Sequence, residues 1–258
     1  MGIDVADVNG DGRPDLFESD MLANDPRRLK TQMPTHTSLT KQPGEQELSL
    51  QFQRNALFLN RGDGTFAEIS QAAGVQASGW SWGSMFMDVD LDGWQDILVA
   101  NGHLWDIMDA DVQEGLQNRL TAVNYQRMRW LFPRLPLKNV AYRNRGDLTF
   151  EDAGRRWRFG TEEDISHGLA SADLDGDGRF DLLAANYGPL GFFSNRGGGR
   201  FEDRAAAWGL AIDSRYDTCA PADVDHDGRL DLYVNGTVTG GASWQDTLFH
   251  NTGAAFVD

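Results

Sequence analysis

The chain has very little cysteine, no long apolar run and a shortage of basic residues. Its single cysteine, Cys219, cannot form an internal disulfide, so disulfides do not hold the fold together. No apolar segment approaches the roughly 20 residues that a membrane helix needs, and no signal peptide is recognisable at the start. With 23 basic and 39 acidic residues the net charge is −16, whereas nucleic-acid binding needs a basic surface. We therefore expect neither a nucleic-acid partner nor membrane insertion.

The acidic residues are concentrated in one motif that occurs four times, D-x-[DN]-x-D-G-x-x-D followed by Leu or Ile. Fifteen of the 39 acidic residues belong to these copies, so the rest of the chain, with 24 acidic and 23 basic residues, is nearly neutral. A diffuse acidic surface would spread the excess evenly, so its concentration indicates metal sites. We call the copies aspartate loops one to four: residues 7–15, 88–96, 173–181 and 223–231.

A second motif follows every aspartate loop. It consists of an apolar stretch, an asparagine, a glycine-containing turn and a phenylalanine, at residues 57–66, 141–150, 192–201 and 248–256. It is typical of a hairpin whose glycine supplies the positive φ of the turn. With one strand before and one after each aspartate loop, every repeat has four strands, as in a propeller blade. We predict an all-β fold: a β-propeller of four-stranded blades, four in this chain and part of a larger ring, with a helical insertion.

The repeats predict blades at about residues 1–79, 80–160, 161–212 and 213–258, with insertions at about 18–54 and 101–138. Both insertions fall between the second and third strands, so we expect them on the face opposite the aspartate loops. The first, with three prolines, is typical of a loop. The second predicts a helix with a capping box at Asp111 and Glu114, ended by Pro133. Its apolar residues recur at helical spacing: Val112, Leu116, Leu120 and Val123.

The aspartate loops have the chemistry of calcium sites. Calcium takes six to eight oxygen ligands, and loops of this type supply side chains at positions 1, 3 and 5, a backbone carbonyl at position 7 and a further acidic side chain. No histidine or cysteine occupies a ligand position, which disfavours zinc and copper. We expect up to four Ca²⁺ ions, bound by Asp7, Asn9, Asp11, Arg13, Asp15; Asp88, Asp90, Asp92, Trp94, Asp96; Asp173, Asp175, Asp177, Arg179, Asp181; and Asp223, Asp225, Asp227, Arg229, Asp231.

The alternative is that these aspartates only shape turns. Aspartate suits turns, but a turn needs one or two carboxylates, not three or four that repel one another. Loop one has Asn9 at position 3 and therefore one charge less, so we expect the weakest site there. Because empty loops crowd carboxylates together, calcium should stabilise the fold.

The two motifs together resemble FG-GAP/VCBS repeat proteins, whose calcium loops are similar to those of integrin α-subunit propellers. Trp80–Gly83, Met87–Asp90 and Val99–His103 are also similar to secreted proteins of the ASPIC/UnbV class, which includes the cartilage acidic proteins. The resemblance implies a calcium-binding propeller that is secreted, periplasmic or on the cell surface. Such proteins usually begin with a signal peptide and end with a further module, so we expect this chain to be a fragment.

Three functions fit these features. We favour a non-catalytic binding or adhesion module in which calcium ions are structural clamps, with a protein or glycan bound on the insertion-bearing face. An alternative is a calcium-dependent polysaccharide lyase, although no constellation singles out a catalytic residue and a fold alone does not assign chemistry. The third is a purely structural part of a larger surface protein.

Other motifs have simpler interpretations. The G-x-S-x-G sequence at residues 79–83 is followed by a strand, whereas a nucleophile elbow needs a helix there. Both Arg-Gly-Asp tripeptides, at 61–63 and 145–147, lie in hairpin turns. His103 is expected in a surface turn. Four tryptophans are expected to pack between blades: Trp80, Trp82, Trp157 and Trp208.

Overall fold

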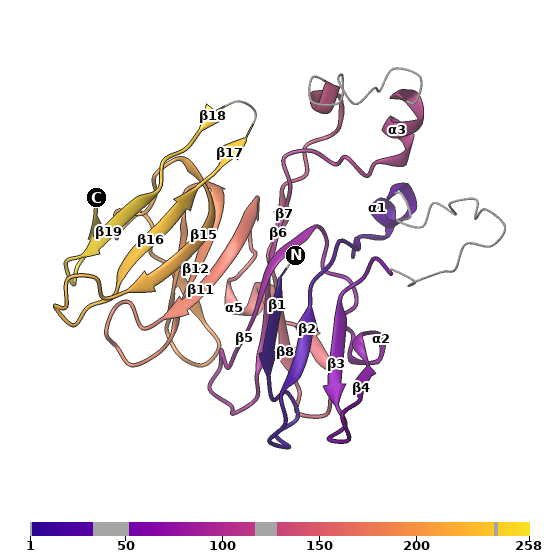
Figure 1. Cartoon of the computed structure of the whole chain (residues 1–258), viewed down its shortest axis with the longest axis horizontal. Helices are drawn as coiled ribbons and strands as arrows, with labels where there is room; N and C mark the ends of the chain where they lie inside the picture. The colour runs from indigo at the N-terminus through magenta and orange to yellow at the C-terminus, as the bar shows by residue number, and fades with distance from the viewer. Residues whose placement is uncertain (1, 33–51, 117–127, 240–241) are drawn as a thin grey trace.

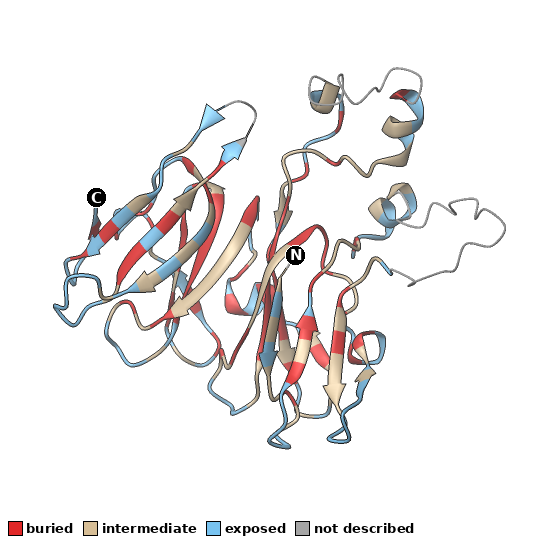
Figure 2. Cartoon of the chain, in the orientation of Figure 1, coloured by how far each residue is buried: buried red, intermediate tan, exposed pale blue. Residues whose placement is uncertain are grey.

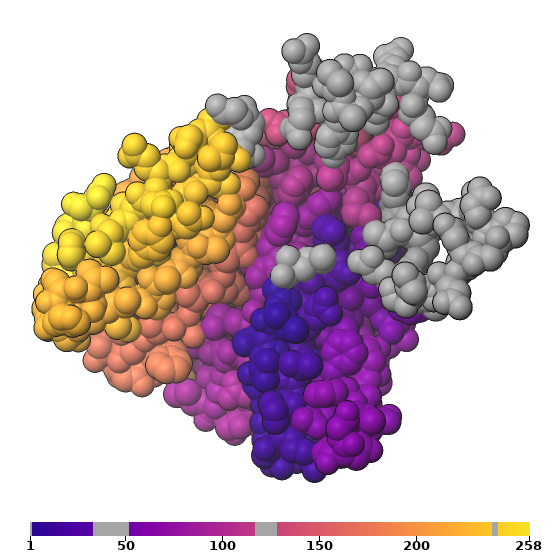
Figure 3. Space-filling view, viewed as in Figure 1, coloured from indigo at the N-terminus to yellow at the C-terminus, as the bar shows by residue number. Residues whose placement is uncertain are grey.

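The computed structural model describes residues 2–32, 52–116, 128–239 and 242–258. Four antiparallel units of four strands follow one another in an arc (Figure 1), and each unit packs against the next (Figure 3); the last two units are joined into one sheet where Tyr187 pairs with Arg215 and Gly188 with Ser214. We call them blades one to four. Blade one contains β1 (Ile3–Ala6), β2 (Asp15–Glu18), β3 (Ala56–Asn60) and β4 (Phe66–Glu68); blade two contains β5 (Ser81–Met87), β6 (Asp96–Asn101), β8 (Val140–Asn144) and β9 (Phe150–Asp152).

The other two blades repeat the pattern. Blade three contains β11 (Ser166–Ala172), β12 (Asp181–Gly188), β13 (Gly191–Asn195) and β14 (Phe201–Asp203); blade four contains β15 (Ser214–Ala222), β16 (Asp231–Gly236), β19 (Thr247–Asn251) and β20 (Phe256–Val257). The first strand of each blade is the inner one, and β5 contacts both β1 and β11. The chain is therefore an all-β fold with propeller blades, as the repeats predict.

Short elements complete the described chain. Two small sheets pair β7 (Leu137–Lys138) with β10 (Glu163–Asp164) and β17 (Val238–Thr239) with β18 (Ala242–Ser243). The helices are α1 (Pro26–Thr31), α2 (Ser70–Ala73), α3 (Ala110–Leu116), α5 (Gly154–Trp157) and the 3₁₀ turn η1 (Arg129–Leu131).

The same register holds in all four blades: the last residue of the first strand pairs with the final aspartate of the loop. These pairs are Ala6–Asp15, Met87–Asp96, Ala172–Asp181 and Ala222–Asp231. The aspartate loops therefore sit at one end of the blades, whereas α1 and α3 lie at the opposite end (Figure 1), which is the side that the blade meander predicts.

Buried residues lie along the strands of the blades (Figure 2), and the burial of one repeat position shows that the core lies between the blades. The residue after the first loop aspartate is Val8, Val89 or Leu174 in blades one to three, and it is at most 3% exposed because the next blade covers it. The equivalent Val224 of blade four is 45% exposed. Burial at this position thus depends on the neighbouring blade.

The insertions differ from the sequence prediction in two details. The first insertion contains helix α1 and not only a loop, since Asp25 caps it and Pro26, with its fixed φ, occupies the first helical position. In the second insertion, Asp111 lies inside α3, and Asp109 accepts the backbone N–H of Val112 at 3.0 Å. The cap is therefore Asp109. Leu120 and Val123 lie outside the described residues.

The remaining sequence motifs have structural roles. Ser81 begins strand β5 and its hydroxyl contacts Ser78 and the buried Asn101, so it is not on a nucleophile elbow. In both Arg-Gly-Asp turns the aspartate accepts the backbone N–H of a threonine two residues later. Trp80, Trp157 and Trp208 are buried, whereas Trp82 is half-buried.

Candidate metal centres

The final aspartate of each loop is a buried anchor. Asp181 is 0% exposed, and its two oxygens accept backbone N–H groups from Leu174 at 3.0 Å and Asn195 at 2.9 Å. The first donor belongs to the loop and the second to the hairpin strand β13, so the carboxylate joins the two sequence motifs of the repeat. Three other aspartates make the equivalent pair of hydrogen bonds: Asp15, Asp96 and Asp231.

The first aspartate curls the loop. In loop three, Asp173 accepts the backbone N–H groups of Asp177 at 3.1 Å and of Gly178 at 3.0 Å. Gly178 has φ of +85°, a conformation that glycine adopts without strain. The same two contacts occur in loops one, two and four. The curl turns the intervening side chains toward one another.

The curled loops bring carboxylate oxygens close enough to share a cation. In three of the loops, three groups offer ligand atoms that all lie within 4.8 Å of one another: Asp88, Asp90 and Asp96; Asp173, Asp175 and Asp181; and Asp223, Asp225 and Asp227. Among the described residues, loop one has no such group of three, because Asn9 replaces the acidic residue at position 3. The lower affinity expected of loop one therefore stays a prediction from its lower charge.

Two buried carboxylate oxygens of the aspartate loops have no hydrogen-bond partner among the described residues. Oδ1 of Asp90 and Oδ1 of Asp175 are both buried and unpaired, although the other oxygen of each carboxylate is well supplied with donors. The Asp175 side chain is only 8% exposed. An unpaired buried acceptor costs about 1–3 kcal/mol, and more when it is charged. These oxygens therefore fit a site that is completed by a cation.

Burial also affects protonation of the anchors. Desolvation raises the pKa of Asp96 to about 7 and that of Asp181 to about 6, although backbone N–H donors act in the opposite direction at both residues. A bound divalent cation would favour the ionised carboxylates. The donors at positions 1, 3, 5 and 9 are oxygens in every loop, and a hard cation such as calcium fits such a set.

One variable position next to the hairpin asparagine faces position 3 of the loop, and the sequence analysis missed it. In blade two, Arg143 binds Oδ2 of Asp90 at 2.6 Å and also contacts Asp92. In blade three, the Ser194 hydroxyl donates to Asp175 at 2.8 Å. The residue at this position therefore sets the local charge of the site. The sequence signal for this position is that it directly precedes the repeated asparagine in every blade.

Blade four corrects an expectation at the same position. The sequence analysis placed no histidine at a ligand position, but Nδ1 of His250 lies 3.6 Å from Asp231 and 3.9 Å from Asp225. The hairpin strand brings it there, and that contact cannot be read from the spacing within the loop. With Asp225 and Asp231, His250 thus forms a second group of three potential ligands in loop four, whose ligand atoms all lie within 4.8 Å of one another.

The position-7 residues also have roles beyond a backbone carbonyl. The guanidinium groups of Arg13, Arg179 and Arg229 pair with the position-5 aspartate of their own loops. Trp94 instead lies against Gly10 of loop one and Gly146 of the next hairpin. The position-7 arginine therefore neutralises one carboxylate in loops one, three and four, whereas the position-7 tryptophan of loop two packs between blades.

The repeated asparagine connects neighbouring blades. The Asn144 amide donates to the carbonyl of Val8 in blade one at 2.8 Å, and Asn251 donates to that of Leu174 in blade three at 3.0 Å. Asn195 makes the corresponding contact with Val89 at 3.4 Å. Because the backbone N–H of each asparagine also donates to the final loop aspartate, the aspartate loops are tied to the interfaces between blades.

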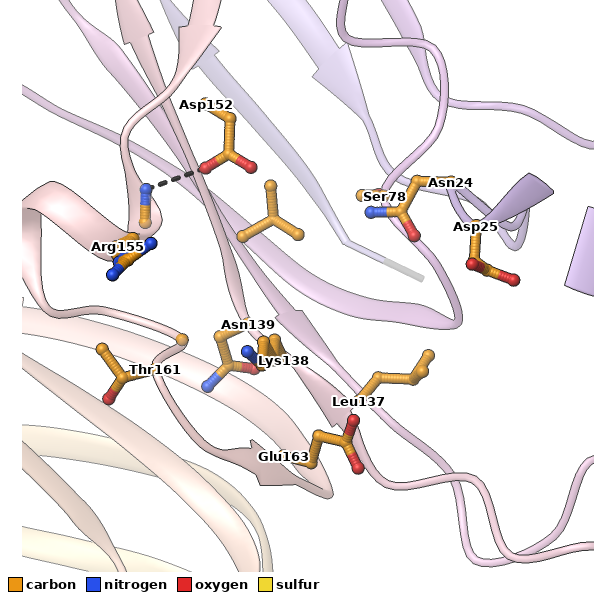
Figure 4. Close-up of a pocket in the computed structure, with 13 residues that line it drawn as sticks. Asn24, Asp25, Ser78, Leu137, Lys138, Asn139, Asp152, Arg155, Thr161 and Glu163 are labelled. Atoms are coloured by element: carbon orange, nitrogen blue, oxygen red, sulfur yellow. Dashed lines mark hydrogen bonds between the residues drawn. The ribbon is translucent and has the colours of Figure 1, made fainter. Parts of the chain in front are cut away.

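The insertion side carries a cavity of about 760 Å³ between the start of α1, strand β7 and helix α5 (Figure 4). Its charged groups have both signs, since Asp25, Asp152 and Glu163 are acidic and Lys138 and Arg155 are basic. His103 also lies on this side and is not in a surface turn, since its ring stacks on Trp80 with centroids 4.6 Å apart. This side is therefore hollowed and rich in polar and aromatic groups.

Fold and site together define a repeat protein built of propeller blades with acidic, metal-binding-type loops. Residues 48–99, 134–184 and 173–234 match the FG-GAP-like repeat family, and together they make up more than half of the chain. The chain belongs to this family.

Individual proteins resemble parts of the chain. Human cartilage acidic protein 1 is 33% identical over 101 residues, which are 38% of this chain and 15% of that protein. The chain therefore spans only a small part of that relative's length. Within the described residues, no helix is both long and apolar enough to cross a membrane.

Two solved structures match the chain at low sequence identity and low structural similarity. The rhamnogalacturonan lyase PL11 of Bacillus licheniformis has a TM-score of 0.41 at 16% identity, covering 95% of this chain and 40% of the lyase. An Agrocybe aegerita lectin that recognises non-reducing terminal N-acetylglucosamine has a TM-score of 0.29 at 16% identity, covering 98% of this chain and 64% of the lectin.

Proposed function

We propose that the chain is a calcium-stabilised propeller region of a non-catalytic extracellular binding module. The observation that carries this proposal is the pair of buried, unpaired oxygens on Asp90 and Asp175, each within a cluster of three carboxylates. Calcium would satisfy these oxygens and offset the repulsion between the carboxylates. Since the final loop aspartates also join strands and hairpins, a bound ion would act as a structural clamp.

The location and partner follow from the same reasoning. Extracellular calcium modules work at roughly 10⁻⁴–10⁻³ M, concentrations that are available outside cells, so we place the protein in a secreted, periplasmic or cell-surface setting. Because the calcium clamps occupy one face of the blades, we expect the partner to bind on the insertion-bearing face. Its cavity and its groups of both charges suit a protein or a glycan partner.

The calcium proposal is tested by titrating chelator-treated protein with CaCl₂ in a calorimeter and by measuring melting curves in EGTA and in calcium. We expect binding with up to four sites and a higher melting temperature in calcium. Asp175→Asn should remove one site. Asp147→Asn, in an exposed turn that asparagine also suits, is the matched control and should bind as the wild type does. Identical melting curves in EGTA and calcium would overturn the proposal.

A further inference from the structure

Three side chains at the same repeat position meet where the inner strands begin. Trp82, His167 and Asp217 each precede the first loop aspartate of their blade by six residues. The pairing register of all three inner strands shifts here, between residues 81 and 84, 166 and 169, and 216 and 218. Such bulges redirect side chains and are common beside functional sites. This end of the strands is the insertion side, away from the aspartate loops.

Glycines after the first two positions allow neighbouring strands to approach closely. A Cβ atom on Gly83 would lie 2.6 Å from the carbonyl oxygen of His167, and one on Gly168 would lie 2.7 Å from that of Asp217. Real Cβ atoms are not found at such distances, so other residues would separate the blades. The close approach lets the rings of Trp82 and His167 contact each other, with centroids 4.5 Å apart and planes tilted by 32°.

Asp217 is shared by two neighbours and keeps one oxygen free. Its Oδ1 lies 2.8 Å from Nδ1 of His167 and 3.0 Å from the hydroxyl of Tyr187. Because a carboxylate only accepts, Nδ1 carries the proton and Nε2 of the imidazole is an acceptor. Burial lowers the pKa of His167, although Asp217 acts in the opposite direction, so burial favours the neutral ring. The described residues donate no hydrogen bond to Oδ2 of Asp217, whose side chain is 35% exposed.

A cavity of about 440 Å³ opens over this cluster. Trp82, His167, Tyr187, Asp217 and Thr218 line it together with the inner-strand glycines. Asp217 is its one charged group among the described residues. His167 and Asp217 do not belong to any group of three metal-type donors in the described chain, so the cavity does not suit a metal ion. It combines aromatic edges with a free carboxylate oxygen and an exposed hydroxyl.

We propose that this cavity binds a neutral sugar ring of a glycan, with Asp217 as the principal hydrogen-bond acceptor. A pyranose carries hydroxyls beside apolar C–H groups, which matches a carboxylate and a hydroxyl beside indole and phenol rings. Asp217 repels a second carboxylate, so uronates are excluded. His167 is a positioning residue, because it holds Asp217 through Nδ1. The inference specifies the partner of the proposed binding module and therefore rests on that function.

The test uses saturation-transfer NMR on the full chain in calcium buffer. The neutral probes are the methyl glycosides of galactose, glucose, rhamnose and N-acetylglucosamine, and methyl galacturonide is the acidic probe. We expect at least one neutral probe to bind and the galacturonide not to bind. Asp217→Asn should weaken that binding at least tenfold. Trp130→Phe, at an exposed tryptophan on the same side but outside the cavity, should leave it unchanged.

Thr218→Val provides a second variant if Asp217→Asn does not fold, because valine preserves the shape and favours a strand. We expect it to weaken binding as well. Failure of every neutral probe to bind, binding of the galacturonide alone, or unchanged affinity in both folded variants would overturn the sugar site. Calcium-dependent melting is measured on the same samples. A normal calcium response without sugar binding therefore refutes this inference and leaves the calcium clamp standing.

Discussion

Replacing Asp181 with asparagine separates the two roles of the final loop aspartate. Asp181 is fully buried and accepts three backbone N–H groups, from Leu174 at 3.0 Å, Asp175 at 3.3 Å and Asn195 at 2.9 Å. Asparagine keeps one acceptor oxygen and replaces the other with a donor. At least one buried N–H therefore loses its partner.

The first effect is on intrinsic stability. One unsatisfied buried group costs about 1–3 kcal/mol, and about 1 kcal/mol shifts the melting temperature of a chain this size by roughly 2–4 °C. In EGTA we therefore expect Asp181→Asn to melt roughly 2–12 °C lower than wild type. The second effect is on calcium, since one occupied site contributes about 2.7 kcal/mol when calcium is at 100 times its Kd.

The assay compares melting temperatures of wild type and Asp181→Asn in EGTA and in calcium. Calcium should raise the melting temperature less in the variant, because loop three no longer completes its site. Asp147→Asn controls for the loss of an exposed carboxylate and should match wild type in both buffers. If Asp181→Asn is destabilised in EGTA but keeps the full calcium increment, Asp181 anchors the strands without binding the ion, and our coordination scheme is wrong.

Three other predictions concern packing, site charge and pH. Leu174→Ala should lower the free energy of unfolding, measured by chemical denaturation, by about 2–5 kcal/mol. Val224→Ala, at the equivalent exposed position, should lower it by well under half of that. Equal losses would contradict burial by the next blade. Arg143→Ser should raise the calcium affinity of loop two in calorimetry, because the competing guanidinium is gone, and an unchanged affinity would exclude competition. Burial lowers the pKa of His167, so as pH falls from about 7 to 5 the unfolded state binds the proton before the folded state does. The wild type should therefore lose more stability over this range than His167→Gln. Parallel pH profiles of the two proteins would show that Asp217 outweighs burial.

The fold was predictable because repetition makes a weak local signal strong. A single aspartate loop predicts only a turn, but four copies, each followed by a hairpin motif, predict four-stranded blades. The register follows from the pattern as well, since the final aspartate pairs with the residue before the first one in every blade. Local rules were less reliable in the insertions, where Asp109 and not Asp111 caps α3, because several acidic residues compete for one cap.

The sequence alone determined where carboxylates gather, since loop residues are neighbours along the chain and one curl brings them together. Only the tertiary structure decided what faces them. Arg143 and His250 come from hairpin strands, and Trp82, His167 and Asp217 come from three different blades. The physical reason is that blade packing and bulges decide which of these side chains meet, although each stands at a fixed spacing from its own aspartate loop or asparagine. The aspartate loops could therefore be read from the sequence, whereas the cavity at the other end of the blades could be found only in three dimensions.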